Sequence, residues 1–507
     1  MNFFGKIPNW AWLTFFCGIA LIQVWLTRNT VMGDAFIHFV FARGITEGQP
    51  FCYNGDFSAG STSPLWSMML SPLWLILGEK IIWGVKFFTS FFVAFSVPLT
   101  FLVARKISQN KNLALIASAL MAGSYVLSFW ASKGMETPFY VCLVLINFLI
   151  YLKIFEVKQS LKWEIILGCL LGLTILTRPE GWFLAVFLGI PLVVKKNWRV
   201  ILTVGIPASL ILSPYYFLLW KNTGGFFPSS AARVLRAQQW AYQISGFYFS
   251  FEVLKILFTK FLFLTPFLIL FSWREKMKKE CFIFFPILAW LVFHIVFFSV
   301  IFPTTEGYRY ILTVLPFIYI ISLLRVWNIN SPKIRVTVLV FILLGSFTVS
   351  GQQLQKRMTS IKNCESFINS TRKEAGIWLK NNTSTEDLIA LKEIDQTAFY
   401  SGRRVLSIDG TLNTTAVPFV QTQNQLGLLQ RLKPNYFVLE EEMYREYPDW
   451  QNSNLIILAD KNLNIGASKI LDNLKFTLLH KIKVGDEKSC THFSQEYFWW
   501  IFEVKYF

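Results

Sequence analysis

Long apolar segments separated by short polar connections fill the first 350 residues of the chain. Several of them approach the roughly 20 residues that an α-helix needs to cross a bilayer. The apolar segments lie at 10–26, 64–78, 81–104, 112–131, 138–152, 163–177, 180–194, 199–219, 252–271, 281–302, 310–324 and 334–350. This pattern predicts an α-helical polytopic membrane domain over residues 1–350.

Lysine and arginine residues concentrate in five connections between these segments. The five lie at 105–111, 153–162, 195–199, 274–279 and 325–335. Because positive residues collect in cytoplasmic loops, we expect all five on the cytoplasmic side. A cytoplasmic N-terminus then requires that segment 64–78, which begins at Pro64 and is interrupted by Pro72, does not cross. We predict about eleven transmembrane helices, with outer loops at 27–63, 133–137, 178–181, 220–251 and 303–309.

The pattern changes after residue 350, and residues 351–507 contain no segment that could span a membrane. Residues 366–380 form an amphipathic helical pattern, and four short apolar runs followed by polar or turn residues predict strands. The four runs are 387–391, 405–408, 436–439 and 455–458. We therefore predict a C-terminal extracytoplasmic α/β domain over residues 351–507.

Composition supports a membrane protein, because 54% of the residues are apolar and only 15% are charged, against about 25% charged in soluble proteins. The net charge of +18 would suggest nucleic acid for a soluble domain. Here the positive-inside rule explains it, and we predict no nucleic-acid partner. Segment 10–26 has few preceding positive residues and no small-residue cleavage site, so we interpret it as a retained helix rather than a signal peptide.

Cysteine spacing and acidic residues give no indication of a metal site. The seven cysteines form no CxxC pair and no Cys/His metal spacing. No acidic cluster of the kind that Mg²⁺ or Mn²⁺ prefers is visible, so no cofactor is required, although a divalent metal stays compatible with the sequence. In an extracytoplasmic tail, Cys364 and Cys490 are either disulfide-bonded or two unpaired thiols.

The loop at 27–63 carries a candidate catalytic group, Asp34, close to the end of the first apolar segment. Polar residues held at membrane depth are costly, and they are therefore suspects for function. At the bilayer surface a carboxylate stays ionised and can face a lipid-linked substrate. The alternative is that Asp34 caps a helix over 35–47, because Asp is a favoured N-cap. The two roles are compatible.

Several motifs occur in order along the chain. They are Gly33-Asp34-Ala35-Phe36-Ile37, Phe41-Ala42-Arg43, Gly48, Tyr53-Asn54-Gly55, Gly60-Ser61-Thr62-Ser63-Pro64-Leu65-Trp66, Gly134-Met135-Glu136-Thr137, Thr177-Arg178-Pro179-Glu180-Gly181, Tyr308-Arg309-Tyr310 before Leu315-Pro316, and Tyr400-Ser401-Gly402-Arg403-Arg404-Val405 with Asp409-Gly410. Together they resemble membrane glycosyltransferases of the GT-C superfamily, most of all the terminal-arabinofuranosyltransferase type and its uncharacterised bacterial relatives. Two positions depart from this resemblance: Gly33 replaces the first residue of an Asp-Asp pair, and Val40 stands where an arginine is frequent.

The resemblance implies an inverting transfer of a hexose or pentose from a polyprenyl-phosphate donor. The acceptor would be a cell-envelope glycan or a lipid, as in lipopolysaccharide or cell-wall synthesis, at the outer face of the inner (plasma) membrane. Asp34 would act as the base that takes the proton from the acceptor hydroxyl. Cations would stabilise the departing phosphate. The expected partners are the donor lipid, a glycan or glycolipid acceptor, and membrane lipids.

The predicted topology places several cations on the outer side, where they are candidates for binding the donor phosphate. Arginine offers a planar fork suited to phosphate. Arg309 is the first choice, because Glu306 and Tyr308 accompany it in a short outer turn. Arg233 follows, in a Pro-Ser-Ser-x-x-Arg stretch that resembles a loop element of related proteins. The others are Arg178 and Lys221. The alternative for each is a side chain that reaches only to lipid headgroups.

Residues near these groups are candidates for binding sugar or acceptor. The candidates are Glu136, Glu180, His38, Arg43 and Tyr308. Glu136 and Glu180 could instead orient the arginines, for example through an ion pair of Glu180 with Arg178. His38 lies four residues after Asp34, on the same face of a helix, but a surface histidine is the simpler interpretation. For His294, inside an apolar helix, we predict an interhelical hydrogen bond.

Two other functional classes share this polytopic architecture. A transporter or flippase for lipid-linked sugars would show internal repeats or discontinuous helices in matching halves. The sequence shows neither, and a transporter needs no charged outer loop or outer domain. The third class is a scaffold without enzymatic activity whose tail binds a partner.

Overall fold

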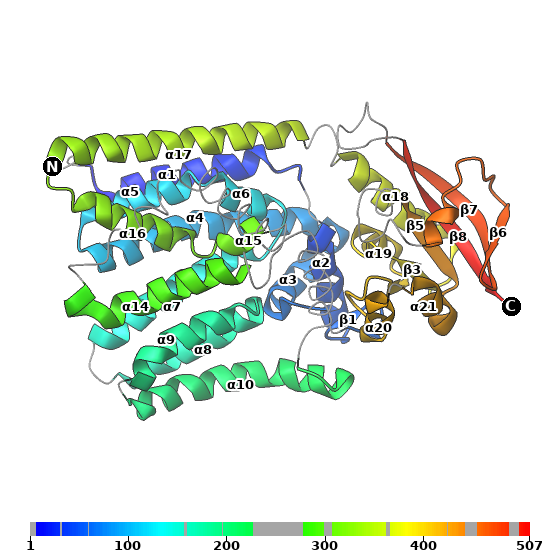
Figure 1. Cartoon of the computed structure of the whole chain (residues 1–507), viewed down its shortest axis with the longest axis horizontal. Helices are drawn as coiled ribbons and strands as arrows, with labels where there is room; N and C mark the ends of the chain where they lie inside the picture. Colours follow the sequence, from blue (N-terminus) through cyan, green and yellow to red (C-terminus); the bar gives the residue numbers. More distant parts are fainter. Residues whose placement is uncertain are drawn as a thin grey trace. The chain divides into compact units, whose positions relative to one another are not determined.

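The computed structural model describes residues 7–30, 33–58, 60–156, 160–194, 196–226, 277–298, 307–360, 366–422, 424–441, 454–485 and 496–507. The chain divides into two compact units, which are described separately below (Figure 1). The first comprises Met1–Val31, Ile82–Tyr215 and Ala241–Met358. The second comprises Met32–Ile81, Tyr216–Trp240 and Thr359–Phe507.

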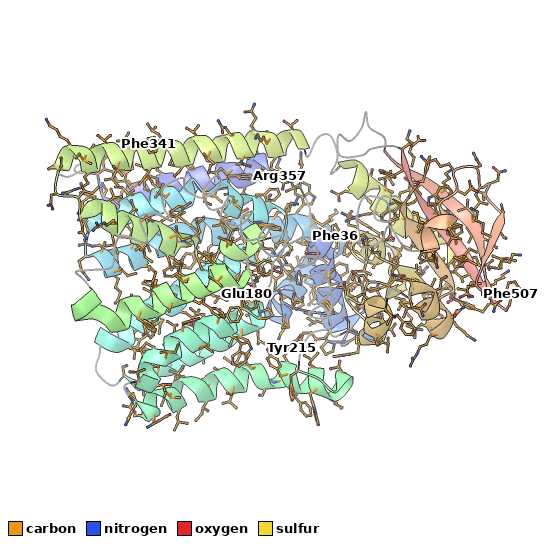
Figure 2. All side chains as sticks on the ribbon, in the orientation of Figure 1. Phe36, Glu180, Tyr215, Phe341, Arg357 and Phe507 are labelled. Atoms are coloured by element: carbon orange, nitrogen blue, oxygen red, sulfur yellow. The ribbon has the colours of Figure 1, made fainter. Side chains whose placement is uncertain are left out.

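The first unit is a bundle of apolar helices. They are α1 (Asn9–Leu26), α4 (Ile81–Ser108), α5 (Lys111–Ala122), α6 (Tyr125–Ser132), α7 (Thr137–Glu156), α8 (Leu161–Thr177), α9 (Gly181–Val194), the start of α10 (Trp198–Thr223), α14 (Met277–Val296), α15 (Gly307–Ile311), α16 (Leu315–Trp327) and α17 (Pro332–Ser360). Large apolar side chains are exposed on α10 and α17, including Leu210 and Phe341, which Figure 2 labels. A helix that is apolar on its outward face is typical of a membrane environment.

Five helical stretches in the described residues are long and apolar enough to cross a bilayer. They are Asn9–Leu26, Pro64–Ser108, Thr137–Ile154, Trp198–Thr223 and Pro332–Thr359. The pair α5 and α6, bent by 46°, could form one more span, and Gly181–Val194, Phe285–Val296 and Leu315–Trp327 are shorter apolar helices. The multi-pass helical prediction is confirmed. The count of eleven and the orientation stay predictions, since segment 252–271 lies outside the described residues.

The second unit contains a mixed sheet and short helices. Its N-terminal part holds α2 (Gly33–Thr46), β1 (Cys52–Tyr53), β2 (Asp56–Phe57), α3 (Pro64–Leu77) and the 3₁₀ turn η1 (Gly78–Lys80). Its C-terminal part holds α18 (Ser366–Asn382), β3 (Leu388–Leu391), α19 (Gln396–Ser401), β4 (Arg404–Ser407), η5 (Thr414–Ala416), α20 (Val417–Gln421), α21 (Gln425–Leu432), β5 (Tyr436–Glu440), η6 (Asn454–Leu458), β6 (Ser468–Leu471), β7 (Leu474–Gly485) and β8 (Tyr497–Tyr506).

Six strands form the main sheet in the order β4-β3-β5-β8-β7-β6 (Figure 1). Strand β3 is parallel to β4 and β5, whereas β8, β7 and β6 continue the sheet with antiparallel pairs. Phe437 and Phe502 are register partners and lie in a fully buried core with Trp500. The core draws side chains from the strands, α21 and η6. The predicted C-terminal α/β fold is therefore confirmed.

The predicted elements of the tail agree with the structure at four of five places. The helix over 366–380 is α18, and the strands over 387–391, 405–408 and 436–439 are β3, β4 and β5. The predicted strand at 455–458 is wrong, because these residues form η6. A continuous apolar run does not distinguish strand from helix. Here Leu455 and Leu458 are buried at helical spacing while Ile457 is 58% exposed.

The predicted outer loop folds together with the tail. Phe36 of α2 packs edge-on against Phe399 of α19, with ring centroids 5.2 Å apart. The Tyr53 hydroxyl donates to the carbonyl oxygen of Ile394, and the Ser58 hydroxyl donates to the carbonyl oxygen of Leu412 at 3.1 Å. Residues 33–80 thus belong to the unit that contains the tail. The domain limits 1–350 and 351–507 stay a prediction.

Candidate functional site

Asp34 lies in the first turn of α2, and its side chain is half-buried. The helix begins at Gly33, so Asp34 lies inside the helix rather than at its N-cap. An acidic side chain in the first turn interacts favourably with the helix dipole. Most of the residues that follow are buried, including Ala35, Phe36 and Phe39. The burial of this helix fixes the position of Asp34.

A second carboxylate, Asp395, lies beside the start of α2. It is 3% exposed and caps α19, where its side chain accepts a hydrogen bond from the backbone N–H of Gln396. Arg372 of α18 forms an ion pair with Asp395 and a second one with Glu393 at 3.4 Å. An ideal Cβ placed on Gly33 would lie 2.0 Å from Oδ2 of Asp395. The carboxylate therefore occupies the space that a side chain at position 33 would need.

The charge state of Asp395 depends on opposing effects. Burial raises the pKa of its carboxyl group to about 7, and the nearby carboxylates of Glu393 and Asp34 act in the same direction. The guanidinium of Arg372 opposes this rise. Sequence reasoning missed both Asp395 and Arg372, because neither lies in a recognisable motif. In the sequence, the glycine at position 33 was the one indication of Asp395. The structure explains it, because the Asp395 carboxylate fills the space that a side chain at position 33 would need.

Arg43 connects α2 to the tail. Its guanidinium donates to the side-chain oxygen of Asn54 and lies 5.6 Å from the ring centroid of Trp74. The amide nitrogen of Asn54 donates to the carbonyl oxygens of Ala398 at 3.0 Å and Arg403 at 2.7 Å. These contacts assign Arg43 and Asn54 to the junction between loop and tail. The role of Arg43 in binding sugar or acceptor stays a prediction.

His38 is buried, with 6% of its surface exposed, so the prediction of a surface histidine is wrong. Its ring nitrogen Nδ1 lies 3.2 Å from the hydroxyl oxygen of Ser67 on α3. The reason for the burial is that α2 packs against α3 over this face. A role of His38 beside Asp34 stays a prediction.

The first unit holds a separate buried ionic cluster. Arg178 ends α8, and its guanidinium donates to carboxylate oxygens of both Glu136 and Glu180. The three side chains are at most 6% exposed, and Glu180 is labelled within the bundle in Figure 2. The backbone turns tightly here, since the N–H of Gly181 donates to the carbonyl oxygen of Arg178 at 2.9 Å. The predicted ion pair is confirmed, and Glu136 joins it.

Arg309 lies in α15 and is 9% exposed. Its guanidinium carbon lies 5.5 Å from the ring centroid of Trp130 and 5.4 Å from that of Tyr310. The guanidinium carbon of Arg178 lies 4.5 Å from the same Tyr310 ring, and the charges of Arg178 and Arg309 repel each other. Aromatic faces attract guanidinium groups, so Tyr310 holds both arginines in this cluster.

His294 makes the interhelical hydrogen bonds that were predicted for it. Its ring nitrogen Nε2 lies 2.9 Å from the carbonyl oxygen of Tyr310 and 3.1 Å from the hydroxyl of Thr313. Of the other predicted residues, Lys221 is exposed near the end of α10. Arg233 and the side chain of Tyr308 lie outside the described residues.

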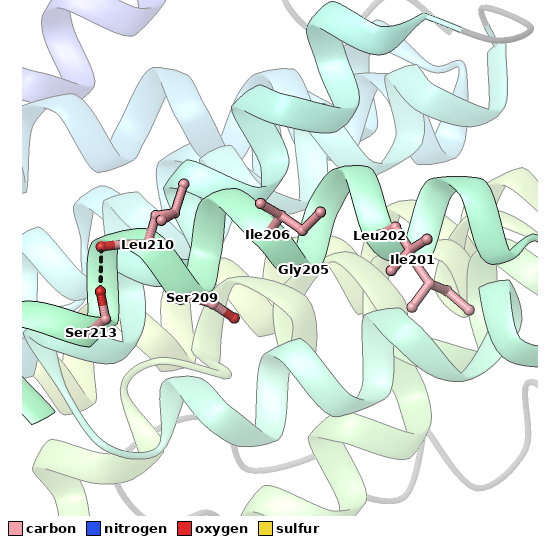
Figure 3. A pocket seen from close by; sticks show the side chains of 7 residues that line it. All are labelled: Ile201, Leu202, Gly205, Ile206, Ser209, Leu210 and Ser213. Atoms are coloured by element: carbon pink, nitrogen blue, oxygen red, sulfur yellow. Dashed lines mark hydrogen bonds between the residues drawn. The ribbon is translucent and has the colours of Figure 1, made fainter.

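A cavity of about 470 Å³ lies along one face of α10 (Figure 3). Its lining comes from that helix alone and consists of Ile201, Leu202, Gly205, Ile206, Ser209, Leu210 and Ser213. The Ser213 hydroxyl is used within the helix, donating to the carbonyl oxygen of Leu210 at 3.1 Å. The lining is apolar and contains none of the predicted site residues.

Within the described residues, no group of three or more His, Cys, Asp or Glu side chains is placed to hold a metal ion. Four described cysteines are free thiols: Cys17, Cys52, Cys142 and Cys169. Cys364 and Cys490 lie outside the described residues, so their disulfide stays a prediction.

Sequence comparisons find little. The chain matches no family model. An uncharacterised protein from Aquifex aeolicus (strain VF5) is 24% identical over 306 residues, which cover 57% of each chain. The chain thus spans just over half the length of this curated relative. The sequence alone places the chain in no established family.

Solved structures share the fold over most of the chain. ArnT from Cupriavidus metallidurans bound to undecaprenyl phosphate superposes with a TM-score of 0.62 at 13% identity, covering 97% of this chain and 98% of ArnT. The Archaeoglobus fulgidus oligosaccharyltransferase in complex with Zn and sulfate superposes with a TM-score of 0.59 at 13% identity, covering 85% of this chain and 68% of that protein. The chain therefore shares the fold of these two proteins. The resemblance to the arabinofuranosyltransferase type stays a prediction.

Proposed function

We propose that this chain is a membrane glycosyltransferase that moves a sugar from a polyprenyl-phosphate donor to a hydroxyl-bearing acceptor, with inversion at the anomeric carbon. The observation that carries the proposal is the fold shared with ArnT over 97% of this chain, in a structure that contains undecaprenyl phosphate. A shared fold alone does not define a reaction. The proposal therefore also rests on the residues of the two polar clusters.

Asp34 is the catalytic base in this proposal. The acceptor hydroxyl attacks the anomeric carbon, its proton passes to the Asp34 carboxylate, and the bond from that carbon to the phosphate oxygen breaks. The leaving group is the polyprenyl phosphate. A base must reach the acceptor hydroxyl. The half-buried position of Asp34 in a helix held by buried aromatic residues provides both access and a fixed orientation.

Arg309 is the first candidate for stabilising the departing phosphate. It is buried among aromatic rings, where a guanidinium interacts more strongly with an anion than in water. The guanidinium of Arg178 already donates to Glu136 and Glu180, so we assign those glutamates the role of orienting Arg178. Lys221 and Arg233 remain secondary candidates for the phosphate.

The acceptor is a cell-envelope glycan or lipid in this proposal, and the protein acts at the outer face of the inner membrane with its tail extracytoplasmic. A hexose and a pentose donor fit the residues equally. The apolar face of α10 and the exposed apolar side chains of α17 suit the acyl chains of donor and bilayer. Tyr308 and Arg43 are assigned to sugar or acceptor contacts.

The decisive experiment uses purified full-length protein and undecaprenyl-phosphate hexose or pentose carrying a labelled sugar, with a cell-envelope extract as acceptor. Wild-type protein should transfer label, and Asp34→Asn should lower transfer at least a thousandfold while donor binding and expression stay close to wild type. Substantial transfer by Asp34→Asn contradicts the assignment of the base. Movement of the labelled lipid across a vesicle bilayer without transfer would indicate a transporter instead.

A further inference from the structure

Gly33 and Asp395 compete for the same space. An ideal Cβ on Gly33 would lie 2.0 Å from Oδ2 and 3.0 Å from Cγ of Asp395, and 3.1 Å from Nη1 of Arg372. Any side chain at position 33 would displace the carboxylate of Asp395. The glycine is therefore needed for the tail to bring an acidic group against the first turn of α2.

The carboxylate of Asp395 is held firmly in this place. Arg372 forms an ion pair with it, and the N–H of Gln396 donates to it. The helix that follows, α19, packs on α2 through the rings of Phe399 and Phe36. Asp34, the residue after Gly33, interacts electrostatically with Asp395. Two carboxylates from segments far apart in sequence thus lie beside the same helical turn.

We propose that Asp395 is a positioning residue for the reaction, forming an acidic pair with Asp34 in which its own carboxylate takes the place of a side chain at position 33. This inference rests on the proposed function. Position 33 is a glycine, and the tail supplies a carboxylate in the space beside it.

The chemistry follows from Coulomb's law. A negative charge beside a base strengthens that base as a proton acceptor. The groups that face Asp395 are Arg372 of α18, the neighbouring Glu393, Asp34 of α2 and the hydroxyl of Tyr53. Burial raises the pKa of Asp395 to about 7. Its charge therefore changes within the neutral range, and transfer should accelerate as Asp395 ionises.

A purely structural role for Asp395 makes a different prediction. The residue caps α19, and Asn is as good an N-cap as Asp. Asp395→Asn therefore keeps the cap and the shape and removes the charge, together with the oxygen that accepts from Arg372. If the residue were structural, activity and stability would fall together. If it acts through Asp34, activity falls while thermal stability above pH 7 stays the same or rises, because a buried charge has been removed.

The first test compares variants of the full-length protein in transfer from labelled undecaprenyl-phosphate sugar between pH 5.5 and 8.5. We expect Asp395→Asn to lower kcat at least tenfold and to remove the rise in rate near pH 7. The matched control is Glu386→Gln, which removes an exposed carboxylate of the same unit outside this cluster and should stay within twofold of wild type. An Asp395→Asn variant with the wild-type rate and pH profile overturns the inference and leaves the proposed function intact. No transfer by the wild type overturns both.

The second test relocates the carboxylate. The double variant Gly33→Asp with Asp395→Gly should transfer sugar at least tenfold faster than the single variant Asp395→Gly. The double variant Gly33→Asn with Asp395→Gly should be no faster than the single variant. The contact itself is tested without any assay of transfer. Gly33→Ala should lower the Tm of the wild type but not that of Asp395→Gly. An equal loss of Tm in both backgrounds contradicts the geometry on which the inference depends.

Discussion

Two regions of the molecule hold charged groups in opposite ways. In the first unit, the buried cluster contains two arginines, Arg178 and Arg309, and two glutamates, Glu136 and Glu180, so that these four charges cancel. Removing charges from water is expensive, and a cluster of this kind persists only when its members satisfy one another. The four side chains of this cluster therefore carry no net charge.

In the second unit, Arg372 forms ion pairs with the carboxylates of Asp395 and Glu393, and the charge of Asp34 also acts on Asp395. This group carries a net negative charge when all three carboxylates are ionised. The raised pKa of Asp395, about 7, favours the protonated form of that carboxyl group below neutral pH. Under the proposed function, the balanced cluster would hold an anion-binding arginine in place, whereas the unbalanced cluster would move a proton. The predictions below test this contrast.

The largest effect is expected from opening the neutral cluster. Arg178→Met leaves the buried carboxylates of Glu136 and Glu180 without their guanidinium and should lower the free energy of unfolding by about 3–5 kcal/mol. Denaturant titration in detergent measures this. The double variant Arg178→Met with Glu180→Gln removes one charge of each sign, so the cluster stays neutral, and it should recover much of the loss. A double variant as unstable as the single one would assign the loss to packing instead.

The unbalanced cluster should reveal itself through pH. The pKa of Asp395 in the folded chain, about 7, lies above its ordinary value of 3.8. The protonated carboxyl therefore stabilises the fold fully below about pH 4, and this contribution is lost as the pH rises through 7. We expect wild-type stability to fall across this window by roughly 4 kcal/mol relative to Asp395→Asn. Tm measurements at pH 4.5 and 8 compare the two proteins, and parallel curves would contradict the raised pKa.

Variants of the two clusters should also change different kinetic constants. Arg309→Ala should raise the KM for the polyprenyl-phosphate donor about tenfold, a loss of about 1.4 kcal/mol of binding. Its kcat should change less, in contrast to Asp34→Asn. Arg309→Lys keeps the positive charge but lacks the planar guanidinium. Its KM for the donor should therefore lie between those of the wild type and Arg309→Ala. Unchanged donor dependence in Arg309→Ala would make Arg309 a structural anchor of the bundle.

The smallest effect is expected at the surface of the second unit. Arg404 of β4 donates to both carboxylate oxygens of Asp56 at 3.1 Å, and the two side chains are 43% and 39% exposed. Exposed ion pairs contribute about 0–1 kcal/mol and weaken in salt. Arg404→Ala should therefore lower Tm by only a degree or two, and less at high salt. A large loss would show that the loop depends on this pair more than on its buried contacts.

The sequence predicted the helical membrane fold, because apolar segments of bilayer length are a strong signal. It also predicted β3, β4, β5 and α18, whose patterns are regular. It did not predict β7 and β8, whose strands of 12 and 10 residues mix lysines with aromatic residues and give no clean alternation. The run at 455–458 was too short and too uniformly apolar to distinguish a strand from a helical turn.

The sequence identified some of the candidate residues and missed others, and the reason is physical. Arg178, Glu180 and Glu136 lie in motifs next to helix ends, where charge is conspicuous against an apolar background. Asp395 and Arg372 lie in a polar tail, where charged residues are ordinary. Their relation to Asp34 depends on contacts between residues hundreds of positions apart, which local patterns cannot report.

The hydrogen bond from Tyr53 to the carbonyl oxygen of Ile394 joins residues 341 positions apart, and this has a consequence for biosynthesis. At about 5–20 residues per second, a ribosome needs roughly 20–70 s to make the intervening chain. Throughout that time the segment around Tyr53 has left the ribosome without the partner against which it packs. A chain that ends before Ile394 therefore lacks this hydrogen bond, even when all the residues of the helices before the tail have been made.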